Sequence, residues 1–454
     1  MIFKKGLSAL KLPHYKGSAG KESVRIAIPE EVILPMTMHP GGPAVPIVSV
    51  GEKVKVGQLI AKEDGKNSSP VHATVSGTVS AIEEMLLTGG KKATVIRIKS
   101  DGKMEKAPEI TPPPVNDLDS FLQAVRESGI VGLGGAAFPL WAKLDAARKN
   151  HIKTVLVNGA ECEPFITSDH RTMLEHSELI KKGIDLLRTY LKSEEFIIGI
   201  ENNKPDAIAK LTDVFAGDSD VKVLPLESVY PQGAKQVLLY NATGLVVNEG
   251  QRLTSLGVII INVSSLAKMA GYFEDGMPLV EKCVTVDGSA AAQSGNFLVP
   301  IGTPIRWLIE QAGGLKAEAG KVIYGGPMMG KTAASMDEPV LKATNAILVF
   351  DRKDCEPPAA SACIHCGRCV EACPIHLNPT EFAKAVSLSD EDEKLEILQR
   401  EKVGLCIECG SCSYICPVGR PLVDYNRDGK KFVRAMAKKA AEAAGIAREG
   451  AKKV

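Results

Sequence analysis

The apolar positions between residues 117 and 270 alternate between two spacings. Residues 117–128 carry apolar side chains at helical intervals, whereas 153–157 is a short continuous apolar run, typical of a buried parallel strand. The same alternation predicts helices over 173–191 and 204–215 and strands over 195–200, 221–226 and 257–261. Strands that alternate with helices in this way predict an α/β domain built on a parallel sheet.

The segments on either side of this region have other patterns. Residues 24–99 consist of short apolar stretches separated by Gly and Pro turns, which predicts an all-β module. Residues 107–116 are a proline-rich linker, and 278–330 follow a β-β-α-β order. Towards the C-terminus we expect helices at 379–385 and 390–400, and a basic, alanine-rich tail at 427–454 that forms an exposed helix with a disordered end.

The composition narrows the class of protein. A length of 454 residues allows about three domains, and 44% apolar and 24% charged residues are ordinary for a soluble globular chain. The formal net charge is only +1, so we expect no nucleic-acid partner. The longest apolar run, 256–263, is far shorter than the roughly 20 residues of a membrane helix, and no signal peptide is apparent. We therefore expect a cytoplasmic protein that reaches a membrane only through partners.

Two cysteine runs near the C-terminus carry the clearest chemistry. Residues 363–374 read CIHCGRCVEACP and residues 406–417 read CIECGSCSYICP, so both follow C-x2-C-x2-C-x3-C-P. This pattern is the signature of a bacterial ferredoxin with two [4Fe–4S] clusters, in which the fourth cysteine of each run binds the other cluster. One cluster is therefore expected on Cys363, Cys366, Cys369 and Cys416, and the other on Cys406, Cys409, Cys412 and Cys373.

Other uses of these cysteines fit less well. A structural zinc site needs pairs of ligands around one tetrahedral ion, which does not match eight cysteines in two identical runs. A disulfide framework is typical of short secreted chains. His365 and His376 lie within this stretch, but in a Rieske centre two histidines replace two cysteines, and no cysteine is missing from either run.

A glycine-rich segment and an acidic strand end indicate a nucleotide site in the α/β region. Residues 129–139 read GIVGLGGAAFP and contain the spacing G-x-G-x-x-A, although this segment follows a predicted helix rather than a strand. By itself it is equally compatible with a turn between two helices. The predicted strand at 153–157 is followed by Asn158, Glu161 and Glu163. Polar groups at the carboxyl end of a parallel strand lie where α/β proteins bind ligands.

These two segments resemble the flavin- and NADH-binding subunit of respiratory complex I. The resemblance is carried by GLGGAAFPLWAKL at 132–144 and by NGAECEP and DHR within 158–171. It implies an FMN site with the following residues: Gly132, Gly134, Gly135 and Lys143 at the flavin and its phosphate, Asn158, Glu161 and Glu163 at flavin or nucleotide, Phe138 on the nicotinamide side, and Asn262 against the FMN. Ala160 and Cys162 stand where that family has Asp and Ser.

Two more segments have family resemblances. VGEKVKVGQLI at 50–60 and VHATVSGTV at 71–79 resemble the biotinyl/lipoyl carrier domain, a flattened β sandwich. The carrier's lysine signature is absent between them, around Lys66, so the resemblance implies a carrier fold used for docking. Residues 278–330 resemble the soluble-ligand-binding β-grasp (SLBB) module that accompanies the flavin domain in the complex I family.

The whole order of segments is similar to the C-subunit family of the Rnf ion-translocating ferredoxin:NAD oxidoreductases. CIHCGRCVEACPIHLNP and CIECGSCSYICPVGRPLVDYNR are the most specific stretches. The resemblance implies a multidomain α/β plus β fold, divided as follows: a lipoyl-like barrel-sandwich domain in 1–106, a linker in 107–116, an FMN/NADH-binding α/β domain in 117–270, an SLBB β-grasp in 271–340, a two-cluster ferredoxin-like domain in 341–426 and a tail in 427–454.

The same resemblance implies the function. The chain would be a peripheral subunit on the cytoplasmic face of the membrane, passing electrons between NAD(H) as substrate, non-covalent FMN and two [4Fe–4S] clusters. Other Rnf subunits, and ferredoxin indirectly, would couple this transfer to Na+ or H+ movement. Because cofactors carry this chemistry, we expect no catalytic side chain. Two other classes stay open: a soluble reductase of the cobalamin-reductase type, and a flavin-free electron carrier or docking subunit, which the departure at Ala160 favours.

Overall fold

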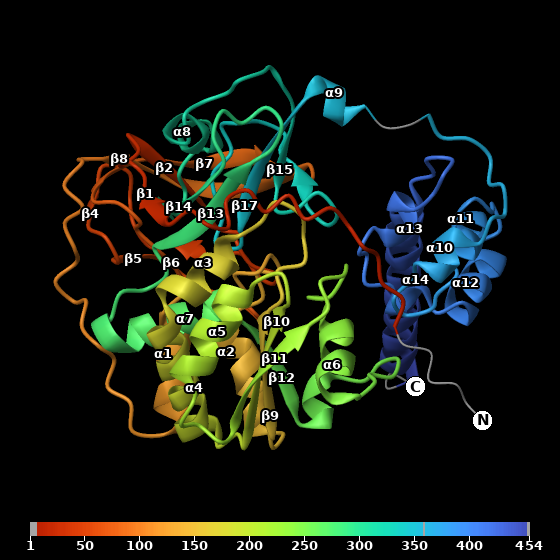
Figure 1. The fold of residues 1–454 in the computed structure, drawn as a ribbon, viewed down its shortest axis with the longest axis horizontal. Helices are drawn as coiled ribbons and strands as arrows, with labels where there is room; N and C mark the ends of the chain where they lie inside the picture. Colours follow the sequence, from red (N-terminus) through yellow and green to blue (C-terminus); the bar gives the residue numbers. More distant parts are fainter. Residues whose placement is uncertain (1–6, 357–358, 452–454) are drawn as a thin grey trace.

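The computed structural model describes residues 7–356 and 359–451, arranged as a large part and a smaller part beside it (Figure 1). The large part stacks β-rich layers on an α/β layer, and the smaller part contains the helices of the C-terminal segment, coloured blue. Within the described ranges, no helix is both long enough and apolar enough to span a membrane.

The first module is a β sandwich. One sheet has the order β2-β8-β7-β4 and the other β3-β5-β6. The strands are β2 (Glu31–Pro35), β3 (Val45–Pro46), β4 (Lys53–Val54), β5 (Leu59–Lys62), β6 (Val71–His72), β7 (Gly77–Leu87) and β8 (Lys91–Ser100). Val32 and Leu34 of β2 and Ile96 and Ile98 of β8 share one core, because alternate side chains of a strand face the same side.

The second module is a parallel sheet of order β11-β10-β9-β12 with helices on both faces. Its elements are α1 (Leu118–Glu127), α2 (Leu140–Leu144), η1 (Asp145–Arg148), β9 (Thr154–Gly159), α3 (Ser168–Glu175), α4 (Ser177–Leu191), β10 (Glu195–Glu201), α5 (Pro205–Val214), β11 (Val221–Leu226), α6 (Lys235–Thr243), η2 (Leu253–Leu256), β12 (Val258–Asn262) and α7 (Val263–Asp275). Val155 shares a core with Ile184 of α4 and Leu266 of α7, whereas Leu156 shares another with Leu238 of α6. Both faces are therefore covered, as the continuous apolar strands predicted.

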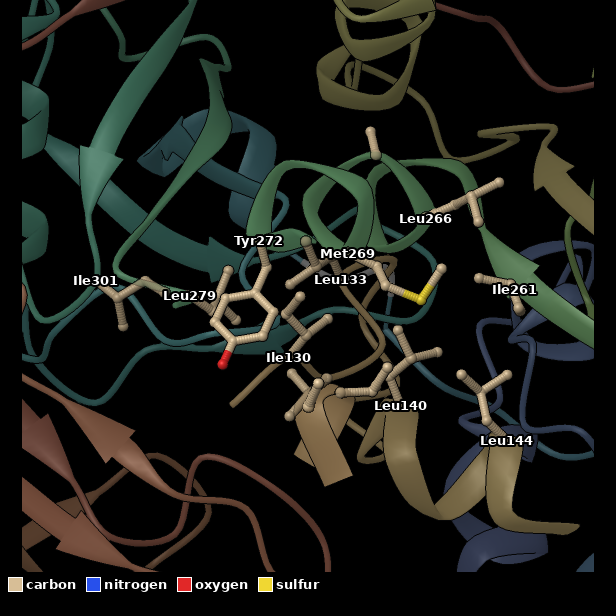
Figure 2. Packing of buried hydrophobic residues seen from close by; sticks show 14 of the residues in the cluster. Ile130, Leu133, Leu140, Leu144, Ile261, Leu266, Met269, Tyr272, Leu279 and Ile301 are labelled. Atoms are coloured by element: carbon tan, nitrogen blue, oxygen red, sulfur yellow. The ribbon is translucent and has the colours of Figure 1, made fainter. Parts of the chain in front are cut away.

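The glycine-rich segment joins α1 to α2 and is anchored by apolar residues on both sides of Gly134 and Gly135. Ile130 and Leu133 lie on one side and Leu140 on the other (Figure 2). All three belong to the core that contains Leu266 and Met269 of α7. This packing holds both ends of the loop against α7 and leaves Gly134 and Gly135 at the surface.

The third module is a six-stranded sheet of order β1-β14-β13-β17-β15-β16. Its elements are β1 (Ser23–Arg25), β13 (Glu281–Asp287), β14 (Gly295–Pro300), α8 (Ile305–Gln311), β15 (Ala319–Tyr324), β16 (Lys331–Thr332) and β17 (Ala346–Asp351). β17 pairs with both β13 and β15, so the sheet continues past residue 340, where we expected the module to end. The predicted end at residue 340 is too early because nothing in the sequence near β17 shows which strands it pairs with. That pairing is visible only in the folded sheet.

The fourth module is helical. It contains α10 (Arg368–Glu371), α11 (Pro379–Val386), α12 (Glu391–Arg400), η3 (Val403–Leu405), α13 (Ser411–Tyr414) and α14 (Leu422–Ala451), preceded by α9 (Arg352–Cys355). α14 starts before the predicted tail and packs closely on α12, since a Cβ on Gly429 would lie 2.9 Å from Leu398 Cδ2. The end of the tail, 452–454, lies outside the described residues.

Two local predictions differ from the structure. The helix expected over 173–191 is two helices, α3 and α4, separated by His176, whose backbone is not helical (φ −129°, ψ 31°). The proline-rich linker is packed on the protein, because a Cβ on Gly276 would lie 2.2 Å from the Thr111 carbonyl oxygen. The linker is therefore a tightly fitted surface segment rather than a free spacer.

Candidate functional site

Asn158 and Asn262 lie side by side at the carboxyl ends of β9 and β12, where they are register partners. The Asn158 side chain donates to the Gly233 carbonyl at 3.0 Å and accepts from the Ala160 amide at 3.2 Å. Asn262 caps α7, because its Oδ1 accepts from the Ser265 amide at 3.2 Å. The two predicted residues from separate strands thus meet at one edge of the sheet.

The glycine loop lies against this edge. A Cβ on Gly134 would come within 2.9 Å of Asn262 Nδ2, and Gly135 has φ +101° with open space where its Cβ would be. In the described part of the chain, no hydrogen bond uses the amides of residues 134–136. Amides of exposed residues with little or no side chain, beside a sheet edge, fit the polar groups and phosphate of a flavin nucleotide.

Phe138 and Lys143 flank the glycines. The Phe138 carbonyl accepts from the Gly132 amide at 2.9 Å, which closes the loop. Lys143 on α2 donates to the Ile260 carbonyl of β12 at 2.7 Å. Burial, with a smaller contribution from nearby Lys235, lowers the pKa of Lys143 to about 8. The contact of Lys143 with phosphate and that of Phe138 with nicotinamide stay predictions.

Glu161 and Glu163 are both bonded to protein amides. The Glu161 carboxylate accepts from the amides of Asp169 at 2.6 Å and His170 at 3.3 Å, in the first turn of α3. Burial raises the pKa of both carboxylates to about 7. Glu163 accepts from two amides of the β-grasp loop at 326–330, at 3.0 and 2.8 Å. These acids therefore join segments of the protein, and their contact with flavin or nucleotide stays a prediction.

Asp169 and Lys16 are site residues that the sequence analysis missed. Asp169 accepts from the Asn262 side chain at 2.6 Å, and burial raises its pKa. Lys16 donates to the carbonyls of Glu161 at 2.9 Å and Glu163 at 2.8 Å. Asp169 had one signal, its position in the DHR stretch, whereas nothing local to Lys16 shows that the N-terminal segment crosses this loop.

Cys162 lies beneath the same edge. Its Sγ accepts from the Gly233 amide at 3.3 Å, and burial raises the pKa of the thiol to about 12. A thiol that stays protonated is a poor nucleophile. The structure therefore favours a packing role for Cys162, whose side chain is half-buried.

The two cysteine runs line two cavities in the helical module. The first, here called the inner cavity, encloses about 340 Å³, partly open to solvent, and is lined by Cys373, Cys406, Cys409 and Cys412. The second, the outer cavity, encloses about 580 Å³, partly open to solvent, and is lined by Cys363, Cys366, Cys369 and Cys416. The fourth cysteine of each run thus lies in the wall of the other run's cavity, which is the grouping that the motif predicts.

The donor set of each cavity fits an iron–sulfur cluster. Burial raises the pKa of the Cys412 thiol to about 12, and the neighbouring Cys406, Cys409 and Cys373 contribute to the shift. The four cysteines of each cavity would bind a cluster as thiolates, and the positive iron ions would offset the repulsion between them. Among the described residues, no group of His, Cys, Asp or Glu is arranged around a single metal ion. Thiols spaced around a cavity, rather than converging on one point, suit a cubane.

Tyr230 connects the α/β module to the inner cavity. It is 1% exposed, and its hydroxyl donates to the Cys409 carbonyl at 2.6 Å. Tyr230, Cys409 and Leu12 form one buried cluster, against which Met328 of the β-grasp packs. The outer cavity includes Ile364, which is 60% exposed. The inner cavity therefore adjoins the α/β module, and the outer cavity contains a surface residue.

Four family profiles match the chain in the order of these modules. They are the RnfC barrel sandwich hybrid domain at residues 2–103, the Nuo51 FMN-binding domain at 125–270, the SLBB domain at 283–332 and a 4Fe-4S dicluster domain at 359–420. Together with the glycine cradle and the two cysteine-lined cavities, these matches define the class: a multidomain electron-transfer protein that uses FMN and two [4Fe–4S] clusters. The predicted fold class and these cofactors are confirmed.

Curated relatives narrow this class to one family. The chain is 40% identical, over 78% of its length and 81% of the relative, to the C subunit of the Na(+)-translocating ferredoxin:NAD(+) oxidoreductase complex of Acetobacterium woodii. It is 38% identical, over 80% of each chain, to the proton-translocating counterpart of Clostridium ljungdahlii. The chain belongs to the C-subunit family of ion-translocating ferredoxin:NAD(+) oxidoreductase complexes, the RnfC family. It is also 35% identical to the C subunit of the ion-translocating oxidoreductase complex of Haemophilus influenzae (strain PittEE), over 82% of this chain and 58% of that relative.

Proposed function

We propose that this chain is the subunit at which NAD(H) reacts in an ion-translocating ferredoxin:NAD+ oxidoreductase. The names of the relatives supply ferredoxin, NAD+ and a translocated Na+ or proton. In our proposal the chain is held peripherally at the cytoplasmic face of the membrane by other subunits of the complex. Ferredoxin exchanges electrons with it indirectly, through those subunits.

The chain's own residues position the cofactors. FMN supplies the exchange between the two-electron chemistry of nicotinamide and the one-electron chemistry of iron–sulfur clusters. The loop of Gly132, Gly134 and Gly135 would hold it through backbone amides, with Asn158 and Asn262 at the edge of the sheet beneath the loop. No side chain needs to act as an acid, a base or a nucleophile in this assignment.

The contact between Tyr230 and Cys409 is the observation that carries the proposal. A buried hydrogen bond of 2.6 Å joins the flavin-type module to the loop that lines the inner cavity. The outer cavity includes the exposed Cys366 and Ile364. We infer that electrons from NADH reach the inner cluster first and the outer cluster second, and that the outer cluster faces a partner subunit.

A pair of ligand substitutions tests this order. The unaltered chain, purified anaerobically, should contain FMN and about eight irons, and NADH should bleach both clusters. Cys373→Ser and Cys416→Ser should each remove about four irons. NADH should still reduce the remaining inner cluster in Cys416→Ser quickly, but reduce the remaining outer cluster in Cys373→Ser poorly.

Three results would contradict the proposal. Equal rates of cluster reduction in both variants would refute the order of transfer. About eight irons without flavin and without an NADH response would support a flavin-free electron carrier instead. A chain that reduces cobalamin on its own and does not co-purify with membrane subunits would support the soluble reductase class.

A further inference from the structure

Asn426 of α14 lies against the sulfur atoms of the inner cavity. It is 2% exposed, and its side-chain amide donates to Cys406 Sγ at 3.5 Å and to Cys412 Sγ at 3.8 Å. Its Oδ1 is buried and has no partner in the part of the chain that the structure describes. The side chain therefore directs its N–H groups at the two sulfurs although its buried carbonyl stays unpaired in that part of the chain, which costs free energy.

Lys430, one turn further along α14, reinforces the same cysteine. Its Nζ donates to the Cys406 carbonyl at 2.8 Å and pairs with Glu408. Residues four apart lie on the same face of a helix, so this face of α14 brings an amide donor and a cation to one ligand loop. The backbone amide of Glu408 also donates to Cys406 Sγ, at 3.4 Å.

The outer cavity has no equivalent among the described residues. A backbone amide, that of His365, donates to Cys363 Sγ at 3.4 Å. Asn378 and Arg420 line this cavity, but in the described ranges no side chain donates to the sulfur of Cys363, Cys366, Cys369 or Cys416. The two runs are alike in sequence, yet their sulfurs differ in hydrogen bonding.

Hydrogen bonds to cluster sulfurs favour the reduced state. Reduction adds negative charge to a cluster, and N–H donors and nearby cations stabilise that charge, whereas burial opposes it. The inner cavity is the more buried of the two around Cys409 and Cys412. Without compensation, its cluster would be the harder one to reduce.

We propose that Asn426, supported by Lys430, is a positioning residue that raises the reduction potential of the cluster on Cys373, Cys406, Cys409 and Cys412. It acts through the thiolates of Cys406 and Cys412, and it offsets the cost of placing a charged cluster next to the flavin-type module. This inference rests on the proposed function, because it takes the inner cluster to be the first acceptor.

The test is an EPR-monitored redox titration of the anaerobically purified full chain. Asn426→Leu keeps the branched shape of the side chain and removes the donors. It should shift the equilibrium of the inner cluster about tenfold towards the oxidised form, which is ~59 mV for one electron, and leave the outer cluster unchanged. Asn378→Leu, in the wall of the outer cavity, is the matched control and should leave the inner potential in place.

The outcomes separate this inference from the function on which it rests. Two clusters with the inner potential unchanged in Asn426→Leu, or with both potentials shifted equally, would overturn the role of Asn426. If Asn426→Leu loses iron, Lys430→Met decides: a lower inner potential supports the inference, and an unchanged one overturns it. An unaltered chain without two cluster signals would instead overturn the proposed function.

Discussion

Tyr230→Phe is the substitution that most directly tests how the flavin-type module is joined to the clusters. The change removes one hydroxyl, which donates to the Cys409 carbonyl at 2.6 Å, and leaves the ring in its buried cluster. The backbone pairing of Tyr230 with Leu10, at 2.8 Å in each direction, is untouched. Burial holds the pKa of Tyr230 far above its usual range, so the phenol acts as a neutral donor.

The size of the effect follows from the burial of the bond. Tyr230 is 1% exposed, so water cannot easily replace the lost donor, and a buried carbonyl left without its partner costs about 1–3 kcal/mol. That cost weakens the contact between the two modules by about 5- to 150-fold. We expect the segment 406–410 to open more often, and electrons from NADH to reach the inner cluster more slowly.

Two measurements follow these effects separately. Hydrogen exchange of the amides in 406–410 reports opening of the contact, and stopped-flow absorbance after NADH addition reports cluster reduction. Tyr414→Phe is the matched control, because Tyr414 lies in the same helical module and is 54% exposed. If Tyr230→Phe leaves both the exchange and the reduction rate as they are in the control, the contact is not what joins the modules.

Three further substitutions test other parts of the structure. Gly134→Ala should lower the amount of FMN bound per chain and cost about 1–3 kcal/mol of unfolding free energy, because the new Cβ would lie 2.9 Å from Asn262 Nδ2. Gly20→Ala is the control, since its Cβ would meet open space, and it should change neither quantity in parallel flavin and urea measurements. Glu163→Ala should cost about 2 kcal/mol of unfolding free energy in urea, since two β-grasp amides lose their carboxylate acceptor. The control Glu318→Ala removes an exposed carboxylate and should cost almost nothing. Equal effects would contradict the idea that Glu163 joins the α/β module to the β-grasp. Burial lowers the pKa of Lys342 to about 7 from 10.5, so the unfolded chain binds the lysine proton more tightly than the folded chain does. The free energy of unfolding should therefore rise with pH between these two values. Lys342→Met should reduce that rise, and an unchanged pH profile would refute this reasoning.

Local patterns were enough to predict several parts of the site. The spacing of the cysteines predicted which runs share a cluster, and the structure places Cys373 and Cys416 each in the wall of the other run's cavity. The strand ends also predicted where Asn158 and Asn262 would meet, because parallel strands of one sheet end at the same edge.

Partners from distant segments could not be predicted in this way. Glu161 and Glu163 were expected at a ligand, yet one is bonded to the first turn of α3 and the other to the β-grasp loop. A carboxylate can accept from any amide that packs against it, and which amide does so depends on the arrangement of whole modules. The boundary at residue 340 was set too early for a related reason, since β17 is recognised only through its pairing with β13 and β15.

The sequence by itself determined the chemistry of this protein: the eight cysteines in two matched runs, the glycine loop and the order of the modules. These features depend on neighbours a few residues apart, whose spacing limits what the backbone can form. Only the tertiary structure decided that Lys16 crosses the acidic loop, that Tyr230 reaches Cys409, and that Asn426 faces two sulfurs of one cavity alone. Each of those contacts joins segments that are apart in the sequence and meet only in the folded chain, so their geometry is not encoded in any one stretch.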